Sequence, residues 1–371
     1  MTTLSRAFSP AVSTPQAQVT TLAERWAMLR EQQSGLRIRN AAALLSVSEV
    51  ELLATLCGQQ HSQAEEQVTR LVCAPYDLLA ELHSVGPLMA LVRNEHAVHE
   101  TIGSFGKLSG NGPVRLFLGA QDQRLFAFRW TKAFFSKTDA RESIQFFNAQ
   151  GSASFKLFTR PDTDMDAWAK LVSRYVAEDQ SQTETVAPAS PETQKVILSH
   201  DEAARLRERW GALRDIHQFN QLLRDFEVGR LTAVQYAGNE WVREVSSDAI
   251  ELALTQAKEQ QLSIMTFVSN GDIVQIHTGV PDRLLRTGPW FNVLDPSFNL
   301  HLNTAGIAQA WVITRPTGDG LVTTLEAFDA HGNSILQLFG ERHEGEPELA
   351  EWRALTEQLP TPDKETVHAS A

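Results

Sequence analysis

An internal repeat is the feature that most constrains the fold of this chain. The matches at an offset of 181 residues are 143–151 (SIQFFNAQG) with 324–332 (TLEAFDAHG), 156–158 with 337–339, and Trp130 with Trp311. Upstream, residues 114–119 resemble residues 274–279 at an offset of 160, so the spacers differ by about twenty residues. The 371 residues therefore predict two copies of one unit, with loop insertions in one copy.

The unit combines hairpins with helices. β-rich runs interrupted by Asn/Asp-Ala-X-Gly or Asn-Gly turns predict three hairpins, at 144–158, 262–279 and 322–339. Apolar residues at helical spacing predict helices within 38–56 and 248–261. Neither a GxGxxG nor a GxxxxGK[ST] motif occurs, so nucleotide-binding folds of those types are not supported. The predicted class is α+β, with two tandem repeats that each form an antiparallel β-sheet with flanking helices.

Composition shifts indicate the domain boundaries. Segments rich in Ser, Thr, Pro and Gln separate or flank the periodic regions. The predicted division is a disordered tail (1–20), an N-terminal repeat (21–178), a linker (179–199), a C-terminal repeat (200–359) and a flexible tail (360–371).

The overall charge of −12 argues against a protein that coats nucleic acid, because an acidic surface repels phosphate. Residues 38–56 have the pattern of a helix-turn-helix, but the second helix carries Glu49 and Glu51, which favours a packing helical hairpin. Only two cysteines occur, which is typical of a reducing compartment. No apolar run is long enough for a membrane helix and no secretory signal is visible, so we expect a cytoplasmic protein without membrane insertion.

Histidines are the candidate metal ligands. His96 and His99 have a spacing that would suit a metal on a helix, although a polar strand or helix face is favoured. Sheet or turn positions are expected for His277, His301 and His331. His217 follows a capping-box-like Asp-X-X-Gln start, about 200° around the helix from the apolar stripe, where an imidazole could project into a cleft.

Several blocks resemble the bacterial cytoplasmic haemin-degrading and haem-transport proteins. They are RNEHAVHE, SIQFFNAQG, TDMDAWAKL, DIHQFNQLLRDFEVGRL, WFNVLDPSFNLHL, AWVITRPTGDG and LQLFGERHEGE, in order through both halves. The resemblance covers nearly all of the chain after the first twenty or so residues. It implies a pair of structural repeats with haem held in a cleft between them.

The resemblance also implies roles for individual residues. His217 matches the axial ligand of the haem iron, and Arg124 matches an arginine that faces the iron from the other repeat. The remaining matched positions, which would bind the propionates or wall the pocket, are Phe126, Arg230, Met265, Arg315, Gln337, Phe339 and Arg342. At Phe339 the family is expected to have tyrosine, so one hydroxyl is missing. Apolar walls suit the flat macrocycle, and arginine forks suit its carboxylates.

Three functions remain open at this point. The chain could take up haem for iron acquisition and cleave it, with Arg124 as a catalytic residue on the distal side. It could instead carry haem without chemistry to a separate haem oxygenase, or be a haem-free scaffold. An inner-membrane haem importer is a further possible partner, and the protein would be a monomer or homodimer.

Overall fold

The computed structural model describes residues 20–33, 35–58, 66–188, 196–343 and 345–362. Most of the two predicted tails lies outside this part of the chain. Within the described part, no helix is long and apolar enough to cross a membrane.

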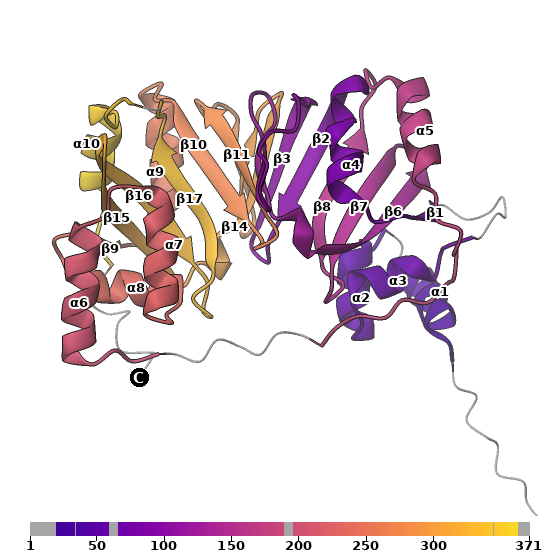
Figure 1. The fold of residues 1–371 in the computed structure, drawn as a ribbon, viewed down its shortest axis with the longest axis horizontal. Coiled ribbons are helices and arrows are strands. Elements are labelled where there is room, and N and C mark those ends of the chain that lie inside the picture. Colours follow the sequence, from indigo (N-terminus) through magenta and orange to yellow (C-terminus); the bar gives the residue numbers. More distant parts are fainter. Residues whose placement is uncertain (1–19, 34, 59–65, 189–195, 344, 363–371) are drawn as a thin grey trace, which may run out of the picture.

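Each half begins with helices and continues into antiparallel strands (Figure 1). The first half contains α1 (Leu22–Gln32), α2 (Ile38–Leu45), α3 (Glu49–Ala54), β1 (Glu66–Leu71), α4 (Pro75–Ala80), η1 (Leu82–Ser84), β2 (Pro87–Arg93), β3 (Ala97–Ser104), β4 (Arg115–Phe117), β5 (Asp122–Leu125), η2 (Ala127–Arg129), β6 (Trp130–Thr138), β7 (Glu142–Asn148), β8 (Ala153–Thr159) and α5 (Met165–Arg174). The second half contains α6 (His200–Gly211), α7 (Ile216–Asp225), α8 (Arg230–Ala237), β9 (Val242–Val245), α9 (Ala249–Glu259), β10 (Ile264–Ser269), β11 (Ile273–Gly279), β12 (Leu284–Thr287), β13 (Trp290–Leu294), β14 (Phe298–Asn303), η3 (Thr304–Gly306), β15 (Gln309–Thr317), β16 (Gly320–Phe328), β17 (Ser334–Gly340) and α10 (Ala350–Glu357).

The two halves exchange strands. Sheet A has the order β1-β6-β7-β8-β2-β3-β14-β13-β12, so its last three strands come from the second half. Sheet B has the order β4-β5-β11-β10-β17-β16-β15-β9, and its first two strands come from the first half. The predicted α+β fold with two repeats is confirmed, but neither repeat completes its sheet alone.

Strand register confirms the repeat in part. The turns at Gly151 and Gly332 are equivalent: both glycines have a positive φ, of 82° and 81°, and stand 181 residues apart. The first hairpins, β2–β3 and β10–β11, are equivalent at an offset of 176, because their pairings with β8 and β17 correspond.

Two of the predicted equivalences are wrong. Residues 114–119 contain β4, whereas 274–279 lie in β11, which corresponds to β3. Trp130 pairs with Asn148, but Trp311 pairs with Glu326, so these tryptophans are not counterparts. The hairpin β15–β16 is four residues longer than β6–β7, and spacers therefore differ by only a few residues.

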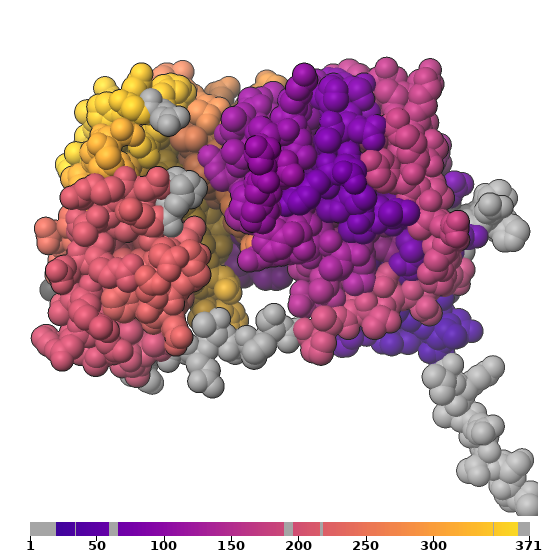
Figure 2. Space-filling model, viewed as in Figure 1, coloured from indigo at the N-terminus to yellow at the C-terminus, as the bar shows by residue number. Residues whose placement is uncertain are grey.

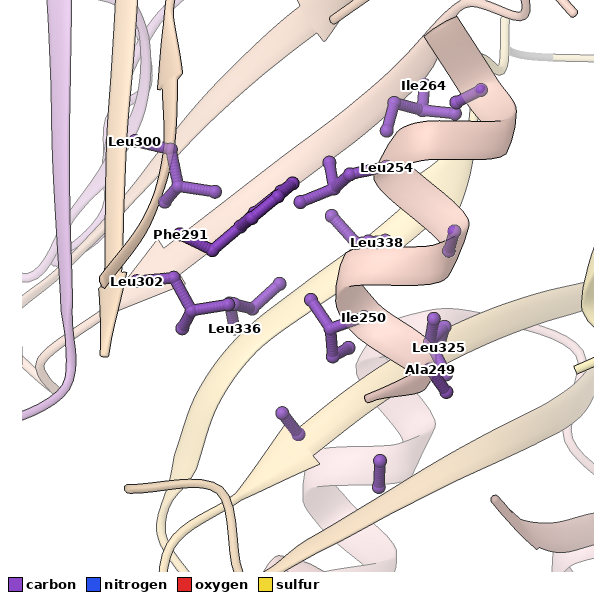
Figure 3. Close-up of a cluster of buried hydrophobic side chains, with 14 of the residues drawn as sticks. Ala249, Ile250, Leu254, Ile264, Phe291, Leu300, Leu302, Leu325, Leu336 and Leu338 are labelled. Carbon is purple, nitrogen blue, oxygen red and sulfur yellow. The ribbon is translucent and has the colours of Figure 1, made fainter. Parts of the chain in front are cut away.

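Helices on opposite faces of sheet B build separate cores. Figure 3 shows one of them, in which Ile250 and Leu254 of α9 pack against Leu338 of β17 and against Phe291 and Leu300 from sheet A. The core on the other face joins α6, α7 and α8 to Ile313 and Phe328. Because the strands of sheet A contribute to the first core, burial of apolar surface holds the halves together.

The short helices α2 and α3 form the predicted packing hairpin. Glu49 of α3 is buried and pairs with Lys156 of β8, so it faces the sheet. Ser48 caps α3 and forms a capping box with Glu51. The described part of the linker, 179–188, runs along the first half, where Glu184 pairs with Arg70.

Candidate functional site

One face of sheet B collects most of the predicted haem contacts. Residues directly opposite one another in an antiparallel pair share a face. Arg124 stands opposite Val274, and two strands further on Met265 stands opposite Phe339. Alternation along β11 and β17 places Arg124, Met265, Phe339 and Gln337 on the same face. Arg124 reaches this sheet only because β5 has crossed from the first half.

A buried ion pair occupies this face near α8. Arg230, the first residue of α8, donates from Nε to Oε1 of Glu326 over 2.5 Å. The Glu326 side chain is fully buried, and it also accepts a hydrogen bond of 2.6 Å from Ser334. Burying a carboxylate is costly unless it is paired, so Glu326 fixes the position of Arg230.

Arg315 of β15 lies beside this pair. Its Nη2 donates to the Thr324 hydroxyl over 2.8 Å. The guanidinium carbons of Arg315 and Arg230 lie 5.0 and 4.9 Å from the ring centroid of Phe219, which belongs to α7. Burial, followed by the charge of Arg230, lowers the pKa of Arg315 to about 9.

Positive charge exceeds negative charge in this cluster. Arg342 is close enough that its charge also lowers the pKa of Arg315, so three guanidinium groups surround Glu326. Among the described residues, Nε of Arg315, Nε of Arg342 and Oε2 of Glu326 are buried without a hydrogen-bond partner. Unpaired buried donors are costly, and an anionic ligand with two negative charges would balance the cluster. We define Arg230, Arg315, Glu326 and Arg342 as the arginine cluster.

An apolar surface adjoins the arginine cluster. The rings of Phe267 and Phe339 are 4.9 Å apart between centroids, and Met265 stands opposite Phe339. Gln337 stands opposite both Phe267 and Glu326, and therefore lies where the apolar surface meets the arginine cluster. This arrangement fits a ligand with a flat apolar body and an anionic edge.

Arg124 lies at the far side of this face, on β5. It forms an ion pair of 3.1 Å with Asp122, two residues earlier on the same strand. Burial raises the pKa of Asp122, and the charge of Arg124 opposes that rise. Phe126 follows the end of β5 and its ring lies 5.8 Å from the Arg129 guanidinium, so it is not grouped with the other predicted wall residues.

His217 lies in the first turn of α7, which runs from Ile216 to Asp225. Its side chain is outside the described part of the structure. Two residues further along α7, Phe219 is buried between the guanidinium groups of Arg230 and Arg315. The start of α7 is thus fixed beside the arginine cluster.

A separate cleft lies between the halves, with a volume of about 950 Å³. Of the predicted haem contacts, only Arg230 lines it. The other described contacts lie on sheet B, so the cleft is not the pocket that the sequence analysis expected. The exchange of β4 and β5 explains the difference, because it joins residues from both repeats in one sheet rather than across a gap.

His96 and His99 do not form a metal site. His96 lies in the β2–β3 turn and His99 is buried in β3, where its Nδ1 is 2.9 Å from Nε2 of Gln275. No cluster of three or more metal-ligating side chains occurs among the described residues. His277 and His301 lie in strands and His331 in a turn, as predicted.

Sequence reasoning missed Glu326 and Asp122. Glu326 lies in an apolar strand run, LEAF, and an acidic residue at such a position signals a buried ion pair. Asp122 and Arg124 are two residues apart in a strand, which places them on one face.

The fold and this face define a protein that binds an amphipathic anion through arginines and an apolar wall. A family model described as the haemin-degrading HemS.ChuX domain matches the chain twice, at residues 46–175 and 227–359. This chain belongs to that family, and the two matches agree with the two repeats. The family resemblance that the sequence predicted, to proteins that bind and degrade haem, is confirmed.

Named relatives agree with this assignment. The chain is 35% identical over 336 residues to the hemin transport protein HemS of Yersinia enterocolitica, covering 89% of this chain and 94% of that protein. Apo-PhuS, a heme-binding protein from Pseudomonas aeruginosa, matches with a TM-score of 0.86 and 40% identity, covering 92% and 98% of the two chains. ChuS, described as an Escherichia coli heme oxygenase, matches with a TM-score of 0.80 and 35% identity, covering 91% and 99%.

Proposed function

We propose that this chain binds one haem on the described face of sheet B and serves haem uptake and iron acquisition. The arginine cluster carries the proposal, because its excess positive charge and unpartnered buried donors suit the two propionates of haem. Met265, Phe267 and Phe339 would form the wall beside the macrocycle. The relatives support the choice of ligand, since HemS is a hemin transport protein and PhuS is heme-binding.

His217 would supply the axial nitrogen, since neutral imidazole is a common ligand of haem iron. The bound haem would supply redox chemistry at iron, and the protein would supply position and charge. Arg124, now paired with Asp122, would donate hydrogen bonds on the side opposite His217. Gln337 would orient the edge of the ligand, where no tyrosine hydroxyl is available at position 339.

Haemin titration tests binding. A sharp Soret band is expected at one haemin per chain, and His217→Ala should weaken or shift it. His200→Ala is the matched control, because His200 is an exposed histidine at the start of α6. The absence of a band at stoichiometric haemin, or equal spectra for both variants and the parent, would contradict the proposal.

Two fates of the bound haem remain as proposals: oxidative cleavage by this chain, or delivery to a separate haem oxygenase. ChuS is described as a heme oxygenase, which supports the first fate for a similar chain. Ascorbate in air, with catalase present to remove free peroxide, distinguishes them. Loss of the Soret band with release of iron indicates cleavage, and a stable band indicates a carrier.

A cytoplasmic location, a monomeric or homodimeric state and an importer as partner stay predictions.

A further inference from the structure

The cleft between the halves is separate from the proposed haem face and has a strongly polar wall. Figure 2 shows the hollow between the two halves. Its walls are the ends of four hairpins, β2–β3, β7–β8, β10–β11 and β16–β17, together with the first turns of α3 and α8. A volume of about 950 Å³ is large enough for a small-molecule ligand.

Hydrogen bonds between the halves fix the walls of the cleft. Asn94 donates from Nδ2 to the carbonyl of Ile335 over 2.8 Å. Asn270, its counterpart in the second half, donates to the carbonyl of Ser154 over 2.9 Å. Because side-chain amides tie each turn to the opposite half, the cleft is preformed and would lose little entropy on binding a ligand.

The carboxylates on the walls are already engaged. Asp272 accepts hydrogen bonds from Asn148 and Ser154, of 2.9 and 2.8 Å. Asp329 accepts the backbone N–H groups of its own turn. These acids stabilise the turns and leave the arginines of the first half as the charged groups open to a ligand.

Arg93 is the cation without a counter-ion. Arg39 pairs with Glu95, and Lys156 pairs with Glu49. Arg93 is half-buried, its Nε donates to the Asn94 carbonyl over 3.4 Å, and no carboxylate among the described residues forms an ion pair with it. Burial, followed by the charge of Arg39, lowers the pKa of Arg93 to about 10. Three cations therefore stand against two carboxylates on this wall.

The charge is confined to one wall. The strand register makes Ser269 the counterpart of Arg93, so the repeat supplies no second arginine there. The opposite wall offers neutral hydrogen-bonding groups instead, including Thr232, Gln235 and Asn333. A ligand with an oxyanion at one end and polar groups at the other matches this distribution.

We propose that the cleft binds a small polar molecule through a carboxylate or phosphate group held by Arg93. The fork of the guanidinium suits two oxygens of either group. This site is independent of haem, because the cleft shares only Arg230 with the predicted haem contacts.

Calorimetric titration of the haem-free protein with inorganic phosphate, and separately with citrate, tests the proposal. One of the two anions should bind at one site per chain, and Arg93→Gln should weaken binding at least tenfold. The matched control is Arg160→Gln, since Arg160 is exposed beyond the other end of β8. Binding of citrate alone assigns a carboxylate ligand, and binding of phosphate alone assigns a phosphate.

No binding of either anion to the parent protein, or equal affinity in Arg93→Gln, would overturn the proposal. Circular dichroism checks that the variant folds. If it does not, amide chemical shifts of the parent protein decide: anion-dependent shifts should gather at residues 93–96 and 270–272. Shifts confined to other regions would also overturn it.

Discussion

The two halves share a backbone and differ in what their helices carry toward the sheet. Ser46 and Glu227 are counterparts 181 residues apart, and both end a helix with a positive φ, of 55° and 52°. Counting from them, Glu49 of the first half corresponds to Arg230 of the second. Each residue begins a helix and forms an ion pair with the sheet beneath, Glu49 with Lys156 and Arg230 with Glu326. The scaffold is kept while the polarity of the pair is reversed.

The same counting separates the binding residues. Leu36 is the counterpart of His217, and it packs against the apolar core of the first half. Thr138, the last residue of β6, is the counterpart of Arg315, which lies in the longer β15–β16 hairpin. The first half therefore lacks both the proposed ligand and the arginine excess. The comparison teaches that one repeat carries the haem site and the other completes its sheet.

The largest expected effect tests whether the scaffolds are equal. Trp168 and Trp352 are fully buried counterparts, in α5 and α10. Replacing either by Ala should lower the free energy of unfolding by about 3–5 kcal/mol, through lost burial and a cavity. Denaturant unfolding of both variants measures this. A loss in only one variant would break the structural equivalence of the halves.

Breaking the buried ion pairs should cost about 3 kcal/mol each, because a charge is left unpaired. Glu326→Gln should also weaken haemin binding, since Arg230 loses the group that positions it. Glu49→Gln should destabilise the first half without changing haemin affinity. Thermal unfolding and Soret titration measure the two quantities. Equal haemin affinities in the two variants would mean that Glu326 has only a structural role.

Removing the arginine of the long hairpin separates binding from stability. Arg315→Met should reduce haemin affinity roughly 10- to 100-fold, the value of one charge-assisted contact. Stability should stay equal or rise, since the buried guanidinium is replaced by an apolar side chain. Thr138→Val is the counterpart control and should leave haemin binding unchanged. A large loss of stability with normal affinity would assign Arg315 to the fold.

Acid should weaken the contact between the halves. Burial lowers the pKa of His99 to about 3 and that of His277 to about 4, whereas an unfolded chain protonates histidine near pH 6.5. Stability is therefore highest above pH 6.5 and falls as the pH drops, by about 1.4 kcal/mol per pH unit for each histidine.

His99→Gln isolates one of these protons, because Gln275 is already the counterpart of His99 in the second half. The slope of unfolding free energy between about pH 6 and pH 4 should decrease by one proton. Denaturant titrations at several pH values measure the slope. An unchanged slope would show that His99 is protonated in the folded protein.

The sequence was sufficient for the local elements and for the existence of a repeat. The hairpin at Asn270-Gly271 and the helix from Ala249 could be predicted from turn chemistry and periodicity. Strand exchange could not, because pairing of β5 with β11 depends on contacts between residues about 150 apart. For the same reason Arg124 could be matched by resemblance, but its place on the second sheet required the structure.

The smallest expected effect concerns helix capping, where the halves also differ. Ser48 caps α3 through its side chain, while its counterpart Gly229 precedes α8 without a side-chain cap. Ser48→Ala should cost about 1 kcal/mol, because the N–H of Glu51 loses its acceptor. Gly229→Ser should gain a few tenths of a kcal/mol, since φ and ψ are already extended and a Cβ meets nothing within 4 Å. Thermal unfolding measures both changes. If Gly229→Ser destabilises the protein, the start of α8 must differ from that of α3 in more than its cap, and Arg230 would owe its position to that difference.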